Sequence, residues 1–318
     1  MRRTTPRPAR LLSARLLTAA GLAGALTAVP GPSAAAPAPV LTGAGVAAAA
    51  PATYRVVAGD TLSGIGVKTG VAWRTIAALN GLEAPYVIRV GQVLKLTGVA
   101  RSNTVTETRR IGTSVKGRPL TTYRKGNPEA TTTLLVLGQM HGTETAGPRT
   151  ARHLIDNVAV PLHLDVWIIP TINPDGAAAG TRTNARKVDL NRNFPSNWKK
   201  QNVGTAVYSG PSAASEPETK ALKAFLDEVR PDYIASIHQP FGGVGTTEKD
   251  PAFVRRLAAN LGLPVESYNC SGVCRGSMTG WYNDTHKGVA VTIEYAPSPS
   301  AAFVRNAAAG ILKSVPAS

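Results

Sequence analysis

Residues 133–144, with the sequence TLLVLGQMHGTE, decide the fold of the larger part of this chain. The apolar run 133–137 predicts a buried strand, and His141 and Glu144 follow it in a short polar turn. Open α/β sheets place their functional sites at the carboxyl ends of strands. The stretch therefore predicts an α/β domain whose site lies where this strand ends.

Strand-like and helix-like segments alternate around this stretch. Further strands are expected at 166–170, 233–237 and 289–293, and helices at 148–158, 215–229, 252–261 and 301–315. Ser215 and Glu218 have the spacing of a capping box, which would open the second of these helices. The alternation over 104–318 predicts an α/β fold, a mixed sheet sandwiched by helices.

Polar residues also follow the other three strands. Asn173-Pro174-Asp175-Gly176 follows the second strand, His238-Gln239-Pro240 the third, and Glu294 the fourth. Two histidines and two glutamates at such strand ends are not what the packing of a core produces. They indicate a site assembled from several strands.

The spacing of these residues favours a metal site. His141 and Glu144 are three residues apart in a turn, so both can reach one ion, and His238 can supply a third ligand. Two nitrogens, one carboxylate and a fourth position for water form the pattern of a catalytic Zn²⁺ ion. Glu294 is then a candidate general base. The His-x-x-Glu pair alone more often marks a histidine satisfied in a core or on a surface, and only its partners favour one zinc ion.

The segment 181–194 holds three arginines beside amide side chains. An arginine fork binds a carboxylate through two parallel hydrogen bonds, and another arginine can stabilise an oxyanion. Without the metal pattern, a charged surface loop would be the better interpretation.

Composition sets the broad class. With 43% hydrophobic and 17% charged residues among 318, the chain can bury a core.

The basic start and the apolar stretch that ends near Ser33-Ala34-Ala35-Ala36 predict a signal peptide over 1–36 and no transmembrane anchor. The formal charge of +16 favours polyanionic partners. No nucleic-acid motif is present, so the anionic cell wall is the expected one, and the alternative is that charge only aids solubility.

Two cysteines, Cys270 and Cys274, exclude a disulfide framework and match no zinc pattern. One local disulfide or two free thiols are both open.

A small separate unit precedes the α/β domain. Residues 37–52 are mostly Ala, Pro, Gly and Val without an amphipathic period, which predicts a linker. Between 53 and 97 the pattern predicts strand, helix, helix and strand: 54–57, a helix capped by Thr61, 73–79 ended by Asn80-Gly81, and a strand within 87–96. A second linker is expected at 98–103.

This unit resembles a LysM module over its full length. The matching residues are Tyr54, Gly59-Asp60-Thr61-Leu62, Ile65, Asn80-Gly81-Leu82, Ile88 and Gly91-Gln92-Val93-Leu94. The resemblance implies binding to glycans that contain N-acetylglucosamine, with Gly59, Asp60, Thr61, Leu62 and Ile88 at the groove. The alternative is a small spacer that binds nothing. One copy implies modest affinity.

The larger domain resembles the zinc carboxypeptidase family. The matching stretches are 111–120, His141-Gly142-Thr143-Glu144, Asn173-Pro174-Asp175-Gly176, 188–194, Ser236-Ile237-His238 and Thr292-Ile293-Glu294, all in family order. The resemblance implies that His141, Glu144 and His238 bind zinc and that Glu294 is the general base. It implies that Asn191 and Arg192 grip the carboxylate of the substrate. Arg182 would stabilise the oxyanion, with Arg186 as a possible substitute.

One family feature is missing. The position of the mobile tyrosine that caps the substrate falls on Gly272, and neither Tyr268 nor Tyr282 is in register. This departure leaves capping unassigned and weakens the expectation of ordinary C-terminal trimming. The loop 269–280 is expected to shape the pocket of the leaving group.

The leading hypothesis is therefore a secreted zinc peptidase that cuts peptidoglycan stem peptides, because the chain resembles LysM-bearing enzymes that cleave γ-D-glutamyl-meso-diaminopimelate bonds. A secreted metallocarboxypeptidase for ordinary peptides is the alternative. A wall-binding protein with an inactive peptidase fold is less favoured, because all the expected site residues are present.

Overall fold

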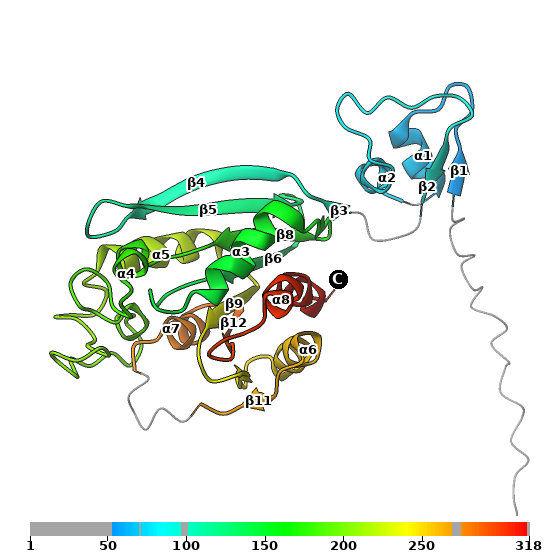
Figure 1. Ribbon diagram of the computed structural model, residues 1–318. Coiled ribbons are helices and arrows are strands. Elements are labelled where there is room, and N and C mark those ends of the chain that lie inside the picture. Colours follow the sequence, from blue (N-terminus) through cyan, green and yellow to red (C-terminus); the bar gives the residue numbers. More distant parts are fainter. Residues whose placement is uncertain (1–52, 70, 97–100, 269–274, 317–318) are drawn as a thin grey trace, which may run out of the picture. The chain divides into compact units, whose positions relative to one another are not determined.

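The structure is a computed structural model that describes residues 53–69, 71–96, 101–268 and 275–316 (Figure 1). The expected signal peptide and first linker, and both cysteines, lie outside the described residues. In the described part of the chain, no helix is both long and apolar enough to span a membrane.

The small N-terminal unit has the expected order of elements. It consists of β1 (Thr53–Arg55), α1 (Leu62–Thr69), α2 (Trp73–Leu79) and β2 (Val93–Lys95), with β1 and β2 antiparallel. Ile65, Ile76 and Leu94 are fully buried at its centre. Thr61 Oγ1 accepts a hydrogen bond from Gly64 N at 3.1 Å, which confirms the expected cap. The last strand is shorter than expected, because a turn closed by the Gln92 N to Arg89 O bond occupies 89–92.

A central sheet of eight strands forms the larger domain, in the order β11-β10-β12-β9-β6-β8-β5-β4. Its strands are β4 (Val105–Thr113), β5 (Pro119–Gly126), β6 (Thr132–Leu137), β8 (Leu164–Ile169), β9 (Tyr233–His238), β10 (Gly243–Gly245), β11 (Val265–Glu266) and β12 (Val289–Glu294). β12, β9, β6 and β8 run parallel, and antiparallel pairings flank them on both sides. The sheet is therefore mixed, as expected.

Helices cover both faces of this sheet (Figure 1). One face packs on α3 (Ala146–Asn157), α6 (Pro251–Leu261) and α8 (Ala301–Ser314), and the other on α5 (Pro217–Val229) and α7 (Met278–Thr285). Along β6, Leu134 and Val136 enter the first core, whereas Leu135 and Leu137 enter the second. The apolar run in β6 is uninterrupted because alternate side chains are buried on opposite faces.

The start of α5 corrects the expected capping box. The helix begins at Pro217, and Glu216 rather than Ser215 is the N-cap. Proline favours the first helical position, where no N–H is needed. Glu218 bonds instead to Val115 N at 3.0 Å and to Asn184 Nδ2 at 3.1 Å. Its carboxylate thus ties the helix to the loop between β4 and β5.

Two further short segments were not expected. Arg101 and Ser102, placed in the second linker, form β3 (Arg101–Ser102), which pairs with β7 (Val160–Pro161). α4 (Pro174–Ala179) follows β8, and Asn173 Oδ1 caps it by accepting from Gly176 N at 2.9 Å. Side-chain capping, rather than apolar periodicity, starts this helix.

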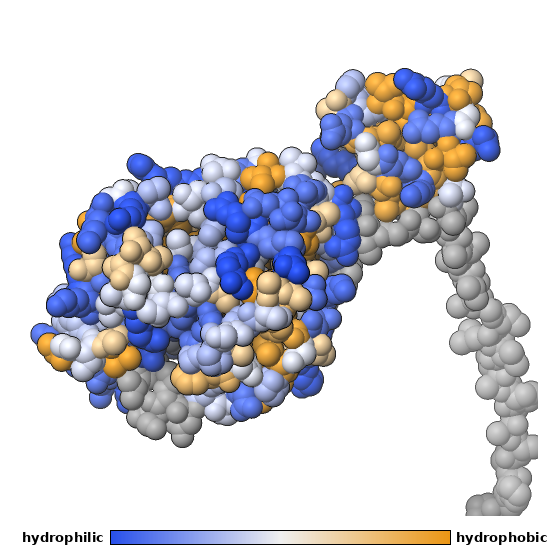
Figure 2. All heavy atoms as spheres, viewed as in Figure 1, coloured by the Kyte–Doolittle hydropathy of each residue, from blue (hydrophilic) through white to orange (hydrophobic). Residues whose placement is uncertain are grey.

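The face of the larger domain seen in Figure 2 is mainly hydrophilic, with small separate apolar patches. The buried apolar residues of this domain form the two cores.

A buried lysine caps the C-terminal end of α3. Lys125 on β5 is fully buried, and its Nζ donates to the carbonyls of Leu154, Ile155 and Val158 at 2.9, 2.7 and 2.9 Å. Burial lowers the pKa of Lys125 to about 8. Leu154 and Ile155 lie in the last turn of α3, where a helix leaves its carbonyls without intrahelical partners, and Val158 is the C-cap residue.

Lys125→Met is expected to lower the free energy of unfolding by about 3 kcal/mol, because two buried carbonyls and one partly buried carbonyl would lose their donor. Urea unfolding of the purified protein measures the change. The control Lys116→Met alters an exposed side chain and should leave stability within about 0.5 kcal/mol of the parent. A Lys125→Met protein as stable as the control would show that the carbonyls find other partners.

Candidate active site

The His-x-x-Glu turn stands at the carboxyl end of β6, as expected. Glu144 N donates to His141 O at 3.0 Å, which closes the turn, and α3 begins two residues later. Gly142 between them packs on the backbone of α4, and a Cβ at this position would collide with Gly176. His238 ends β9, the strand next to β6 in the sheet. The order of strands reverses beside β6, where α/β sheets place their ligand crevices.

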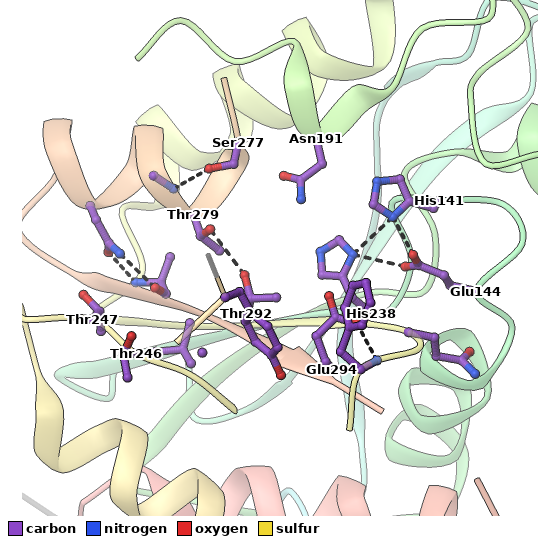
Figure 3. A pocket seen from close by; sticks show the side chains of 18 of the residues that line it. His141, Glu144, Asn191, His238, Thr246, Thr247, Ser277, Thr279, Thr292 and Glu294 are labelled. Carbon is purple, nitrogen blue, oxygen red and sulfur yellow. Dashed lines mark hydrogen bonds and ion pairs between the residues drawn. The ribbon is translucent and has the colours of Figure 1, made fainter. Parts of the chain in front are cut away.

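Three side chains meet at this edge of the sheet (Figure 3). The ligand atoms of His141, Glu144 and His238 all lie within 4.8 Å of one another, and all three residues are buried. His141 Nδ1 is 2.6 Å from one carboxylate oxygen of Glu144, and His238 Nδ1 is 3.1 Å from the other. The two Nδ1 atoms are 3.3 Å apart.

The Nε2 atoms of both imidazoles also have hydrogen-bonding partners. His141 Nε2 lies 3.0 Å from Asp189 Oδ1, and His238 Nε2 lies 3.2 Å from Ser236 Oγ. A carboxylate only accepts, so Asp189 favours the tautomer of His141 with its proton on Nε2. The Nδ1 atom of His141 then offers a lone pair on the side of Glu144, where a proton or a metal ion can lie between the two groups. The donor set therefore fits a zinc ion, with outer contacts that orient its ligands.

Charge within the cluster supports the same interpretation. Burial opposes the charged form of Glu144, but the neighbouring histidines lower its pKa to about 2. Burial also opposes protonation of His141, yet Asp189 and Glu144 raise its pKa. The cluster thus keeps its carboxylate ionised and attracts positive charge, which a divalent cation supplies.

Asp189→Asn is expected to weaken zinc binding by about 10- to 100-fold, because the amide can no longer hold His141 as a carboxylate does. Competition with a chelating dye measures the affinity. The control Asp165→Asn removes another buried carboxylate, one that pairs with Arg124 away from the site. Equal affinities in the two variants would contradict an orienting role for Asp189.

Glu294 lies beside the cluster at the end of β12. It pairs in register with His238 on the parallel strand β9, so both side chains reach the same edge of the sheet. Burial raises the pKa of Glu294, and the nearby Glu144 carboxylate adds to this effect. A carboxylate with a raised pKa is a stronger base than an exposed one, which suits proton transfer.

The structure separates the candidate arginines. Arg182 and Arg192 line the cavity next to the metal group, together with Asn191. Arg182 donates to Asp189 Oδ2 from Nε at 3.0 Å and from Nη2 at 2.9 Å. Arg186 does not line the cavity; its side chain is 57% exposed and lies 3.7 Å from Glu216. Geometry thus favours Arg182 over Arg186 for a role in the site.

Asp189 organises this side of the cavity. It is fully buried, caps the 3₁₀ turn Leu190–Arg192 by accepting from Asn191 N at 2.9 Å, and contacts both His141 and Arg182. Asp189 belongs to the 188–194 stretch that matches the family, but the sequence alone assigned it no role. Its position two residues before Asn191 was the available signal.

α7 corrects the loop expected at 269–280. The helix begins at Met278, because Ser277 Oγ accepts from Gly280 N at 3.2 Å and Asn191 Oδ1 accepts from Met278 N at 2.9 Å. Residues 269–274 of that loop lie outside the described residues. Of the two nearby tyrosines, Tyr268 lines the cavity with Phe241, whereas Tyr282 is buried and bonds to Pro231 O.

The cavity holds about 340 Å³ and extends from the metal group across to α7 and β10. Asn173 and Asp175, which follow β8, do not line it. Asn173 caps α4, and Asp175 bonds to Lys116 N and to Arg118. These two residues shape the fold around the site.

In the small unit, the expected groove residues have different surroundings. Gly59 and Thr61 are exposed, and Ile88 is partly buried against the core of the unit. The Leu62 side chain is 6% exposed in that core. The Asp60 carboxylate is occupied by Tyr54, Val57 N and Lys68. Leu62 and Asp60 therefore stabilise the turn, and a role for them in glycan binding stays a prediction.

An α/β sheet that brings two histidines and a glutamate to one point, beside a buried glutamate and two arginines, defines a zinc metallopeptidase. Residues 96–240 match the model of the zinc carboxypeptidase family, and residues 54–97 match the LysM domain. The chain belongs to the zinc carboxypeptidase family and carries a LysM domain before the peptidase domain.

Individual relatives agree with this assignment. Murein peptide amidase A of Escherichia coli K12 is 33% identical over 211 residues, which cover 61% of this chain and 83% of that protein. Its counterpart from Vibrio campbellii is 31% identical over 201 residues, 58% of this chain and 78% of that one. The crystal structure of murein-tripeptide amidase MpaA from Escherichia coli O157 superposes with a TM-score of 0.56 at 28% identity, covering 66% and 93% of the two chains.

Proposed function

We propose that this chain is a secreted, wall-associated peptidase that hydrolyses peptidoglycan stem peptides between γ-D-glutamate and meso-diaminopimelate. The main support is one cavity that joins the His–Glu–His group to Asn191 and Arg192, in a chain that also carries a LysM domain. The relatives named for murein peptides support the same substrate class.

The chain's own residues supply most of the chemistry. Bound zinc supplies Lewis acidity, which lowers the pKa of water and polarises a carbonyl group. Glu294 takes a proton from the attacking water and delivers it to the leaving amine. Arg182, held by Asp189, donates to the oxyanion that develops on the scissile carbonyl.

Asn191 and Arg192 hold the carboxylate of the leaving residue. Arg192 is buried, and its Nη1 donates to Asn191 O at 2.8 Å, so the guanidinium is fixed in place. Asn191 is fixed through its bond with Met278 N. Diaminopimelate keeps a free carboxylate next to the cleaved amide, and this carboxylate presents the same group as the C-terminus of a peptide. A rigid guanidinium binds such a group in two parallel hydrogen bonds.

The LysM domain would bring the enzyme to its substrate. A shallow groove in this domain is lined by Leu82, Val87, Arg89 and Gln92. Ile88, which was expected at the glycan groove, lies between Val87 and Arg89 in the sequence. We propose that this groove and the exposed turn at Gly59 and Thr61 bind the glycan of peptidoglycan. Co-sedimentation with insoluble peptidoglycan tests this proposal. If a protein that starts at residue 101, and so lacks the LysM domain, binds as well as the full chain, the glycan is not bound by this groove.

The zinc-loaded protein should be incubated with L-Ala-γ-D-Glu-meso-diaminopimelate and with an ordinary peptide of matched length. The products should then be identified by mass spectrometry. Release of diaminopimelate supports the proposal. Cleavage of the ordinary peptide alone would make the protein a secreted metallocarboxypeptidase with a wall-binding domain. Zinc binding without cleavage of either peptide would indicate a wall-binding protein with an inactive peptidase domain.

A further inference from the structure

A groove on the surface of the peptidase domain is formed by α3 and α8. The two helices pack side by side (Figure 1), and Thr150 Oγ1 on α3 donates to Val304 O on α8 at 3.0 Å. Three arginines line this groove: Arg149 and Arg152 come from α3, and Arg305 comes from α8. All three are exposed, and strongly hydrophilic side chains gather over this part of the surface in Figure 2. Among the described residues, this arginine groove shares none with the catalytic cavity.

The charge of the arginine groove is not neutralised by acidic side chains. Elsewhere in the domain, exposed arginines form ion pairs: Arg109 pairs with Glu228, and Arg118 pairs with Asp175. Within the described part of the chain, no ion pair joins an arginine of the arginine groove to a carboxylate. Among the lining residues that the structure describes, Asp156 is the only acid. Three positive charges and one negative charge leave +2, with histidine counted as neutral. The arginine groove therefore attracts anions.

The arrangement of the arginines fits an anion whose charges repeat along a chain. Residues three apart on a helix have their Cβ atoms about 5–6 Å from each other, so Arg149 and Arg152 form a row, and Arg305 stands across from it. Each guanidinium can bind a phosphate in two parallel hydrogen bonds. A glycerol-phosphate repeat has six backbone bonds, which span roughly 7 Å when extended, as two amino-acid residues do. Successive phosphates of such a chain can therefore pair with successive arginines.

The lining of the arginine groove does not favour nucleic acid. Proteins bind the bases of single strands by stacking them on aromatic side chains. Among the described residues, no phenylalanine, tyrosine or tryptophan lines this groove, and its apolar lining consists of Pro148, Ala301 and Val304. The lining thus favours a polymer that is recognised by its charged groups alone.

We infer that the arginine groove binds a phosphodiester polymer of the cell wall and gives the enzyme a second contact with the wall, besides the LysM domain. The inference rests on the wall association proposed above, but it does not depend on which peptide bond is cut. A single LysM domain gives modest affinity, and a second contact on the same chain raises the overall affinity because the two act together.

The test measures the binding of fluorescently labelled poly(glycerol phosphate) to the full chain by fluorescence anisotropy. The double variant Arg149→Gln/Arg305→Gln removes one arginine from each helix. It should lower the affinity by about 10-fold, because two exposed charge pairs are lost. Its rate of cleavage of the soluble stem peptide should equal that of the parent, since neither residue lines the catalytic cavity.

The matched control is Arg110→Gln/Arg255→Gln, which removes the same charge from two exposed arginines outside the arginine groove. It should bind within about 2-fold of the parent. Equal losses in the two double variants would show unspecific attraction and overturn the inference, as would a parent that does not bind. Binding of a DNA oligonucleotide or of polyglutamate as tight as that of poly(glycerol phosphate) would also overturn it. A parent that binds the polymer but cleaves no stem peptide would overturn only the cleavage part of the proposed function.

Discussion

Glu294→Gln is expected to lower kcat/KM by about 10³- to 10⁴-fold and to leave the zinc content at one ion per chain. The amide keeps the shape of the side chain but cannot take the proton from water. Glu294 is not among the three residues that converge on one point, so the metal should remain bound. Initial rates on the γ-D-glutamyl-meso-diaminopimelate substrate and metal analysis of the same preparation provide the two measurements.

Two controls make this result interpretable. Glu107→Gln alters a carboxylate on β4, far along the sheet from β12, and should keep full activity. Circular dichroism should show that Glu294→Gln is folded. If the variant keeps most of its activity, another group is the base. If it loses zinc, Glu294 contributes to holding the metal.

His238→Ala is expected to lose zinc and to lose activity by roughly 10³-fold or more, because the Lewis acid contributes several kcal/mol to the rate. His238 is the ligand from β9, whereas His141 and Glu144 share one turn after β6. The remaining two ligands cannot close a three-ligand site. Metal analysis after dialysis and rates with and without added Zn²⁺ measure both losses.

The matched control is His153→Ala, which alters a histidine on α3 that does not line the cavity. It should bind one zinc ion and retain activity. The parent protein stripped by a chelator should behave like His238→Ala and recover when zinc returns, whereas the variant should not recover. Full activity in the stripped parent would contradict a catalytic metal.

The metal-binding residues could be predicted from the sequence because their signals are local. A buried strand is visible as an apolar run, and polar residues directly after it must lie at the edge of the sheet. His141, Glu144, His238 and Glu294 all have this position, and the structure brings the first three to one point with Glu294 beside them. The LysM domain was assigned by its resemblance to that family, and its strand, two helices and strand could be predicted because they follow one another within a short span.

Capping and turn residues were harder to predict because several neighbours compete for the same role. Ser215 and Glu218 fit a capping box, but Pro217 sets the first turn and Glu216 takes the cap. Leu62 was assigned to the glycan groove because it belongs to the LysM pattern, although an apolar residue at the start of a helix is equally suited to a core. The pattern does not separate residues kept for folding from residues kept for binding.

From the sequence alone, the family, the mixed α/β fold and the zinc ligands could be assigned, because each depends on patterns within a few neighbouring residues. Only the tertiary structure placed Arg182 but not Arg186 in the wall of the cavity and gave Asp189 its place behind His141. The contact of Asp189 with His141, for example, joins residues that are 48 positions apart in the chain. Which distant side chains meet depends on the order of the strands and on how the helices pack, and no local pattern records that.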